Sequence, residues 1–103
     1  MITKFKLFGS INEGEPKVGD YVICEESVSG EVVKEFISNN IGIFSKSIHD
    51  ETFKYSIEYE NIPDNIYGAF TNKCRRMSRQ EIKYWSKDKE ELEILLVTNK
   101  YNL

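Results

Sequence analysis

The residues best suited to chemistry gather in one basic segment of the chain, residues 73–85. Arginine and lysine side chains contact phosphate groups, and aromatic rings stack on bases. The segment combines both kinds, because cations surround one cysteine and two aromatic residues follow: Lys73, Cys74, Arg75, Arg76, Arg79, Lys83, Tyr84 and Trp85. This pattern is typical of a surface that binds nucleic acid. The candidate binding residues are Arg75, Arg76, Arg79, Lys83 and Tyr84.

The overall charge favours a simpler interpretation of the same segment. The formal net charge is −3 at pH 7, whereas proteins that bind nucleic acid usually carry a basic excess. In this interpretation the arginines lie along a solvated strand edge and pair with Glu58 and Glu60, and Trp85 belongs to the core. Nucleic-acid binding is therefore the second hypothesis for function.

The sequence pattern gives little support to catalysis. His49 is the single histidine, and with Cys24 or Cys74 it would supply a nucleophile and its base. Such a pair needs a third orienting group and an oxyanion donor, and no motif identifies either. Two cysteines are also too few for a disulfide scaffold or a zinc site. We expect a protein that is not an enzyme, with no catalytic residue, no metal and no cofactor.

Charge is unevenly distributed along the chain. Residues 13–60 hold eleven acids and four lysines, a balance of −7, whereas residues 61–86 hold two acids and five bases, a balance of +3. This asymmetry predicts two faces of opposite sign if the fold separates the segments. An acidic face would dock on a basic partner. An ordinary solvated surface of mixed charge explains the same counts more simply.

The spacing of apolar residues predicts a domain built mainly from short strands. Residues Phe53–Glu60 alternate most clearly between apolar and polar side chains. The turn at Gly19-Asp20 precedes a hydrophobic run, and Gly42 is expected at a bulge or sharp bend that helps to close a small barrel. The predicted strands are residues 2–8, 21–26, 41–44, 53–60, 75–77 and 82–85.

Two helices complete the predicted domain. Residues Glu31–Ser38 carry an apolar face at helical spacing, and a second helix over about residues 88–98 begins with Asp88 as its N-cap. Ser78–Glu81 has the spacing of a capping box and predicts a short 3₁₀ turn. One long helix over Arg79–Asn99 is an alternative. We prefer a strand followed by a helix, because Ser86–Asp88 has the composition of a new helix start.

Four motifs in order carry a resemblance to a known fold family. They are Lys17-Val18-Gly19-Asp20-Tyr21-Val22, Ile41-Gly42-Ile43, Tyr55-Ser56-Ile57-Glu58-Tyr59-Glu60-Asn61 and Ile82-Lys83-Tyr84-Trp85. This order resembles SH3-like barrels of the KOW and Tudor type. The stretch from Tyr55 to Trp85 is similar to small uncharacterised SH3-like proteins of bacteriophages and large DNA viruses. The resemblance covers residues 17–86 and implies a binding or accessory module without catalytic residues.

These observations predict one domain over residues 1–103. We expect a mainly β, α+β fold: a small SH3-like antiparallel barrel over about residues 17–86 with a short inserted helix and a C-terminal helix. Four side chains should meet inside the barrel: Tyr21, Ile43, Ile57 and Trp85.

The leading functional hypothesis is a non-catalytic phage or viral module that binds a protein. Its partner would be a host factor, a defence component or a virion component, and the C-terminal helix could also join two copies of the chain. Residues 2–6 alternate in polarity, unlike the continuous apolar region of a secretion signal, so we expect a cytoplasmic protein that does not contact a membrane.

Overall fold

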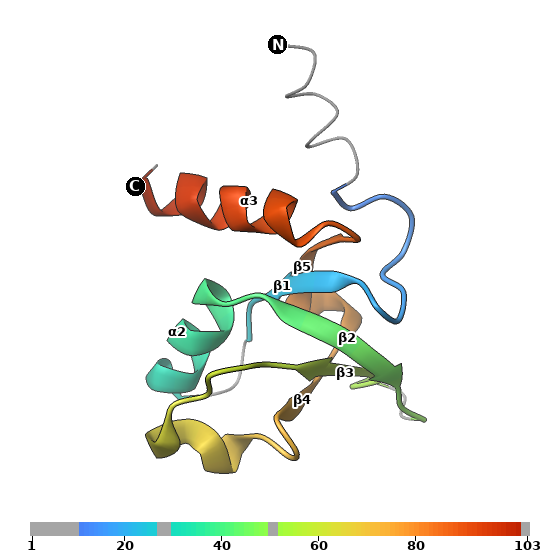
Figure 1. The fold of residues 1–103 in the computed structure, drawn as a ribbon. Helices are drawn as coiled ribbons and strands as arrows, with labels where there is room; N and C mark the ends of the chain where they lie inside the picture. The colour runs from blue at the N-terminus through green and yellow to red at the C-terminus, as the bar shows by residue number, and fades with distance from the viewer. Residues whose placement is uncertain (1–10, 27–29, 50–51, 102–103) are drawn as a thin grey trace.

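In a computed structural model the chain forms a small α+β domain that is mainly β. The structure describes residues 11–26, 30–49 and 52–101, and the strand predicted over residues 2–8 lies outside them. Five antiparallel strands form one sheet in the order β4-β3-β2-β1-β5 (Figure 1). The strands are β1 Tyr21–Cys24, β2 Gly42–Ser47, β3 Tyr55–Glu58, β4 Cys74–Met77 and β5 Ile82–Ser86.

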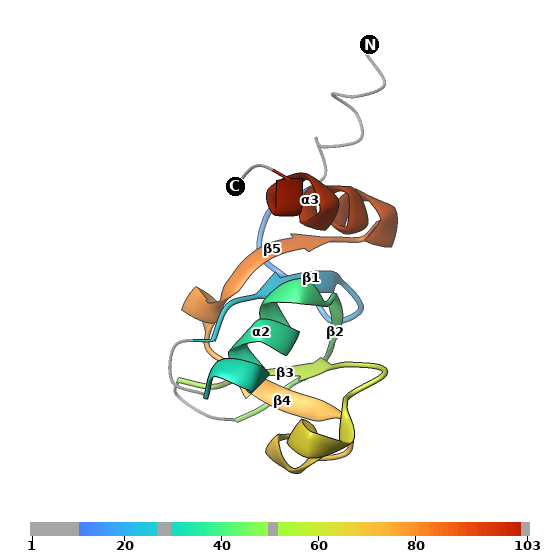
Figure 2. The same cartoon turned by 90° about the vertical axis from the view of Figure 1, so that its left-hand side faces the viewer.

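Within the described part of the chain, two α-helices and two 3₁₀ helices connect and cover these strands. Helix α2 (Glu31–Asn39) is inserted between β1 and β2, and helix α3 (Lys89–Tyr101) follows β5. The 3₁₀ helices are η1 (Asp64–Ala69) and η2 (Arg79–Glu81). Figure 2 shows α2 in front of the sheet and α3 at one end of the molecule, next to β5. The inserted helix and the C-terminal helix are both confirmed.

The edges of the sheet are β4 and β5, and within the described residues these two strands do not pair with each other. The outer edge of β5 is occupied by one residue, Asn12. Its backbone N–H donates to the carbonyl of Trp85 at 2.8 Å, its side-chain Oδ1 accepts from the Trp85 N–H at 3.0 Å, and its Nδ2 donates to the carbonyl of Lys83 at 3.2 Å. The loop before β1 thus satisfies the backbone groups that β5 would otherwise expose.

The predicted core was right for two of its four residues. Ile57 and Trp85 are buried, but Tyr21 is only half-buried and Ile43 is 37% exposed. In both strands the adjacent residue, Val22 or Phe44, enters the core instead. Successive side chains on a strand point to opposite faces, so an error of one residue in phase reverses every assignment on that strand.

Gly42 has a different role from the one predicted. The irregularity in the sheet lies three residues later, where the register between β2 and β3 shifts between Phe44 and Lys46. A Cβ on Gly42 would lie 2.4 Å from Ile57 Cγ2 and 2.9 Å from the ring of Tyr59. Glycine is needed here because two core side chains pack directly against the backbone.

An aromatic cluster joins α2 and the segment after β3 to the sheet. The rings of Phe36, Tyr59 and Phe70 meet edge to face, with centroids 5.8–5.9 Å apart. Such geometry adds to the stabilisation that burial alone provides. The Tyr59 hydroxyl is buried and has no hydrogen-bond partner of good geometry among the described residues. It interacts with the equally buried thiol of Cys24.

The C-terminal region is a strand followed by a helix, as preferred. The backbone N–H of Ser78 donates to Glu81 Oε1 at 2.8 Å in the predicted capping box, and the chain then enters β5. Asp88 Oδ1 accepts the N–H of Glu90 at 3.0 Å, which is N-capping geometry. Leu92 is fully buried and anchors the first turns of α3.

Candidate functional site

The structure places Arg75 in a buried ion pair. Its Nη2 donates to Glu26 Oε1 at 2.9 Å, its Nε also donates to the Glu26 carboxylate, and its Nη1 donates to the carbonyl of Ala69 at 2.6 Å. The Glu26 side chain is only 3% exposed. The predicted pairing with Glu58 or Glu60 is therefore wrong for Arg75. Its guanidinium instead links Glu26, in the segment after β1, to Ala69 at the end of η1.

Arg79 is also paired. Its Nε donates to Glu15 Oε1 at 2.7 Å, and its guanidinium lies 4.5 Å from the ring centroid of Trp85. The hydrogen bond with Arg79 lowers the pKa of Glu15, and the same bond raises the pKa of Arg79. This arginine fastens the loop before β1 onto the indole, which itself belongs to the core as predicted.

The remaining predicted binding residues lie on the two opposite edges of the sheet. Arg76 is exposed on β4, whereas Lys83 is exposed on β5. Tyr84 is half-buried and lies opposite Ile23 of β1. The five residues therefore do not form one basic surface, and two of the three arginines are neutralised by glutamates.

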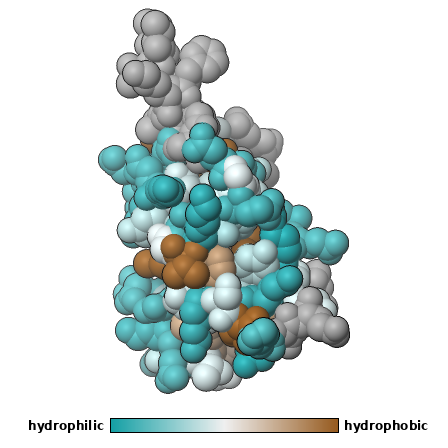
Figure 3. All heavy atoms as spheres, turned by 90° about the vertical axis from the view of Figure 1, so that its right-hand side faces the viewer, coloured by the Kyte–Doolittle hydropathy of each residue, from teal (hydrophilic) through white to brown (hydrophobic). Residues whose placement is uncertain are grey.

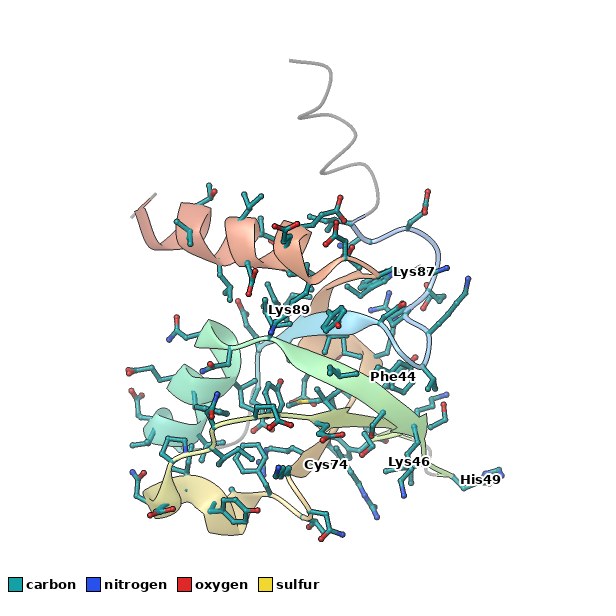
Figure 4. All side chains as sticks on the ribbon, viewed as in Figure 1. Phe44, Lys46, His49, Cys74, Lys87 and Lys89 are labelled. Atoms are coloured by element: carbon teal, nitrogen blue, oxygen red, sulfur yellow. The ribbon has the colours of Figure 1, made fainter. Side chains whose placement is uncertain are left out.

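The cysteines and the histidine are not arranged for nucleophilic chemistry. Burial raises the pKa of Cys24 to about 12, so its thiol stays protonated near neutral pH. Cys74 is half-buried, with its Sγ 3.8 Å from Ser45 Oγ. Figure 4 shows His49 beyond the end of β2, pointing away from Cys74. Among the described residues no group of three or more Cys, His, Asp or Glu side chains is placed to hold a metal ion.

A groove of about 590 Å³ follows β4, the edge strand. Three of the four residues of β4 line it, together with residues of β2 and β3. The connection between β2 and β3, the segment from the end of η1 to β4, Glu81 of η2 and Glu26 after β1 complete the lining. Cationic, aromatic and neutral polar side chains are all present in the lining: Lys46, Arg76, Phe53, Ser56, Thr71 and Asn72. Lys46 and Arg76 both lie opposite Ser56 in register, so their side chains leave the same face of the sheet.

A second cleft of about 300 Å³ lies between α3 and the open side of the sheet. Its apolar part consists of Tyr21, Ile41, Ile43 and Leu96. Three glutamates and one lysine also line it: Glu58, Glu60, Glu93 and Lys89. Glu60 lies 3.7 Å from Lys73 Nζ, but both side chains are about half exposed or more, so solvent screens this pair. The cleft therefore combines an apolar floor with a net negative rim.

Neither hollow was predicted from the sequence. Lys46 and Arg76 are thirty residues apart in the chain, and only the pairing of β2 and β4 with β3 brings them to one face. Glu93 was predicted in the C-terminal helix, but nothing in the sequence placed that helix over Ile43. The charge counts of the sequence identify neither hollow, because Lys46 belongs to the acidic segment and Glu93 lies outside both counted segments.

Comparison with protein-family models, with curated proteins and with solved structures gives no match for this chain. Among the described residues no helix is long and apolar enough to cross a membrane. The function must therefore be inferred from the geometry of these surfaces.

Proposed function

We propose that this protein is a non-catalytic interaction module and that it binds a basic, amphipathic segment of a partner protein in the cleft beneath α3. The observation that carries the proposal is the pairing of an apolar floor with an acidic rim in one hollow. Such a surface favours a peptide that has apolar side chains on one face and lysine or arginine at its margins.

The exposure of Ile43 supports this choice of surface. It is 37% exposed in the middle strand of the sheet, where the adjacent Phe44 is buried. Among the other exposed large apolar side chains that the structure describes, Ile94 and Val97 lie together on α3. The side of the molecule in Figure 3 is mostly hydrophilic with small separate hydrophobic spots. A partner that bound through a broad apolar patch would find none on that side among the described residues.

The proposal extends to the finer fold class. The four motifs that carry the resemblance to SH3-like barrels fall on β1, β2, β3 and β5, and β5 lies beside β1 in the sheet. We propose that the fold is a variant of this barrel and that the protein belongs with the phage and viral interaction proteins it resembles. Its partner would then be a host factor, a defence component or a virion component.

The nucleic-acid alternative through the predicted basic segment has less support. Arg75 and Arg79 each donate to a glutamate, and Arg76 and Lys83 lie on opposite edges of the sheet. A labelled oligonucleotide that bound at low salt and lost binding in Arg79→Gln would restore this alternative.

The proposed function is tested by fluorescence anisotropy with a labelled leucine- and lysine-rich amphipathic peptide. Glu58→Gln combined with Glu93→Gln should weaken binding about tenfold or more, because each lost charge contact contributes on the order of 1 kcal/mol. Glu35→Gln is the matched control, since Glu35 is exposed on α2 and does not line the cleft. Equal weakening by the control, or no peptide binding at low salt, would contradict the proposal.

A further inference from the structure

The groove along β4 exposes two cations that no described residue neutralises. Lys46 and Arg76 are both exposed, and neither forms an ion pair or side-chain hydrogen bond with any residue that the structure describes. Each lies opposite Ser56 in the sheet, so their Cα atoms are separated by two strand spacings, about 10 Å. Long side chains on either side of one small residue of the same face can converge on a single anion above it.

The backbone of β4 leaves one donor on the outer side of the strand, away from β3. Thr71 and Cys74 exchange backbone hydrogen bonds of 2.8 and 2.9 Å on the side of β4 away from β3. Arg76 is two residues further along the strand, so its N–H also points away from β3. No described residue accepts that N–H. The outer edge of β4 therefore carries a backbone donor at Arg76, on the side of the strand away from Lys46.

The acids in the groove do not cancel this charge. Glu26 is held by Arg75, and Glu81 is buried, with its carboxylate accepting the backbone N–H of Ser78. Neutral polar residues complete the wall: Ser56, Thr71 and Asn72. Phe53, which is 39% exposed, supplies an aromatic face in the same hollow.

We propose that this groove binds a nucleotide, with its phosphate between Lys46 and Arg76 and its base against Phe53. Arginine and lysine pair with phosphate oxygens, and aromatic side chains stack on bases without regard to sequence. The volume of about 590 Å³ is within the usual range for sites of small ligands. This site combines Arg76 of the basic segment with Lys46 and Phe53 from outside that segment, and it does not depend on the cleft beneath α3.

The test is titration of the full chain at low salt, followed by NMR or calorimetry, with three ligands: inorganic phosphate, adenosine monophosphate and a short oligothymidylate. We expect adenosine monophosphate to bind more tightly than phosphate, because only the nucleotide reaches Phe53. Tighter binding of the oligothymidylate would identify the nucleotide as a unit of a single strand. Tighter binding of adenosine monophosphate would identify a free nucleotide.

Three variants make the assignment specific. Lys46→Gln and Arg76→Gln should each weaken nucleotide binding about tenfold, which corresponds to the loss of one charged hydrogen bond. Phe53→Leu should weaken the binding of the nucleotide but leave the binding of inorganic phosphate unchanged. Lys83→Gln, on the opposite edge of the sheet, is the control and should change nothing.

The proposal is overturned if none of the three ligands saturates at low salt. It is equally overturned if the two cation variants, checked for unchanged thermal unfolding, bind the nucleotide as the parent chain does. Binding of an acidic peptide in place of every nucleotide would assign the groove to a protein partner and would also refute it.

Discussion

At the level of single residues, Gly42 is the described glycine at which an added side chain would clash with its neighbours. A methyl group there would overlap Ile57 and the ring of Tyr59, both of which are fixed in the core. We expect Gly42→Ala to lower the free energy of unfolding by about 1–3 kcal/mol, the usual cost of overpacking. Chemical denaturation measures this, with Gly68→Ala as control because a Cβ on Gly68 meets nothing within 4 Å. Equal stability of the two variants would contradict the packing described around Gly42.

Tyr59 packs well in the core, but its hydroxyl lacks a hydrogen-bond partner of good geometry among the described residues. Removing its buried hydroxyl in Tyr59→Phe takes away an atom without a good partner and keeps the ring contacts with Phe36 and Phe70. We expect the stability to stay equal or to rise, since an unsatisfied buried polar group costs about 1–3 kcal/mol. Tyr59→Ala should cost about 3–5 kcal/mol, in line with large-to-small changes of core aromatics. A large loss in Tyr59→Phe would show that the hydroxyl has a strong partner.

The two cysteines should differ in reactivity. Cys24 is fully buried, and its pKa of about 12 keeps it protonated, whereas Cys74 is half-buried on an edge strand. A thiol reagent at pH 8 should modify one thiol in the folded protein and both after unfolding, and mass spectrometry should assign the first to Cys74. Fast modification at Cys24 would contradict the described core.

The raised pKa of Cys24 makes the stability of the fold depend on pH. An unfolded cysteine titrates near pH 8.5, so the folded state binds the proton more tightly than the unfolded state does. The contribution of Cys24 to the free energy of unfolding is therefore complete below about pH 8.5 and is lost as the pH rises from about 8.5 toward 12. Burial also raises the pKa of Tyr59, which acts in the same direction.

At the level of elements, the connection from β4 to β5 rests on local capping. The capping box between Ser78 and Glu81 satisfies backbone donors of η2, and the carbonyl of Glu81 accepts the N–H of Glu25 at 2.8 Å. We expect Ser78→Ala to lower the free energy of unfolding by about 1 kcal/mol, as for other caps. Denaturant titration measures the change, and Ser38→Ala, at an exposed hydrogen bond in α2, serves as comparison. A stability equal to that of the parent would indicate that η2 does not need its cap.

The elements were easier to predict than the faces they present. Capping signals at Ser78 and Asp88 are local, so the strand and the helix of the C-terminal region could be predicted from neighbouring residues. The phase of β1 and β2 could not, because Tyr21-Val22 and Ile43-Phe44 are adjacent apolar pairs that fit either face equally well. Only tertiary contacts with α2 and α3 decide which member of each pair is inside.

The two candidate sites could not be predicted from the sequence. A basic segment was visible in the sequence, but its partners are far away in the chain: Arg75 pairs with Glu26 and Arg79 with Glu15. Such ion pairs depend on how loops fold over the sheet, which local sequence does not specify. Lys46, which stands alone in the sequence, acquires its place beside Arg76 only through the register of β3.

At the level of the whole molecule, charge is polarised along the open face of the sheet. Glu58 and Ser56 lie on the same face of β3, with the acidic cleft at the Glu58 end and the cations of the β4 groove around Ser56. The two hollows thus differ in charge, but neither is built from a single charged segment of the sequence. Both proposed ligands should bind less tightly as salt is raised, because exposed charges are screened over about 8 Å at physiological ionic strength.

The most direct measurement is an NMR titration of the labelled protein with the leucine- and lysine-rich amphipathic peptide. We predict saturable shifts at the amides of Tyr21, Ile43, Glu58 and Glu93, with weaker binding as salt is raised and no response to a glutamate-rich peptide of the same apolar pattern. Shifts confined to other surfaces, or no saturation at low salt, would contradict the account of this protein as a module that binds basic partners beneath α3.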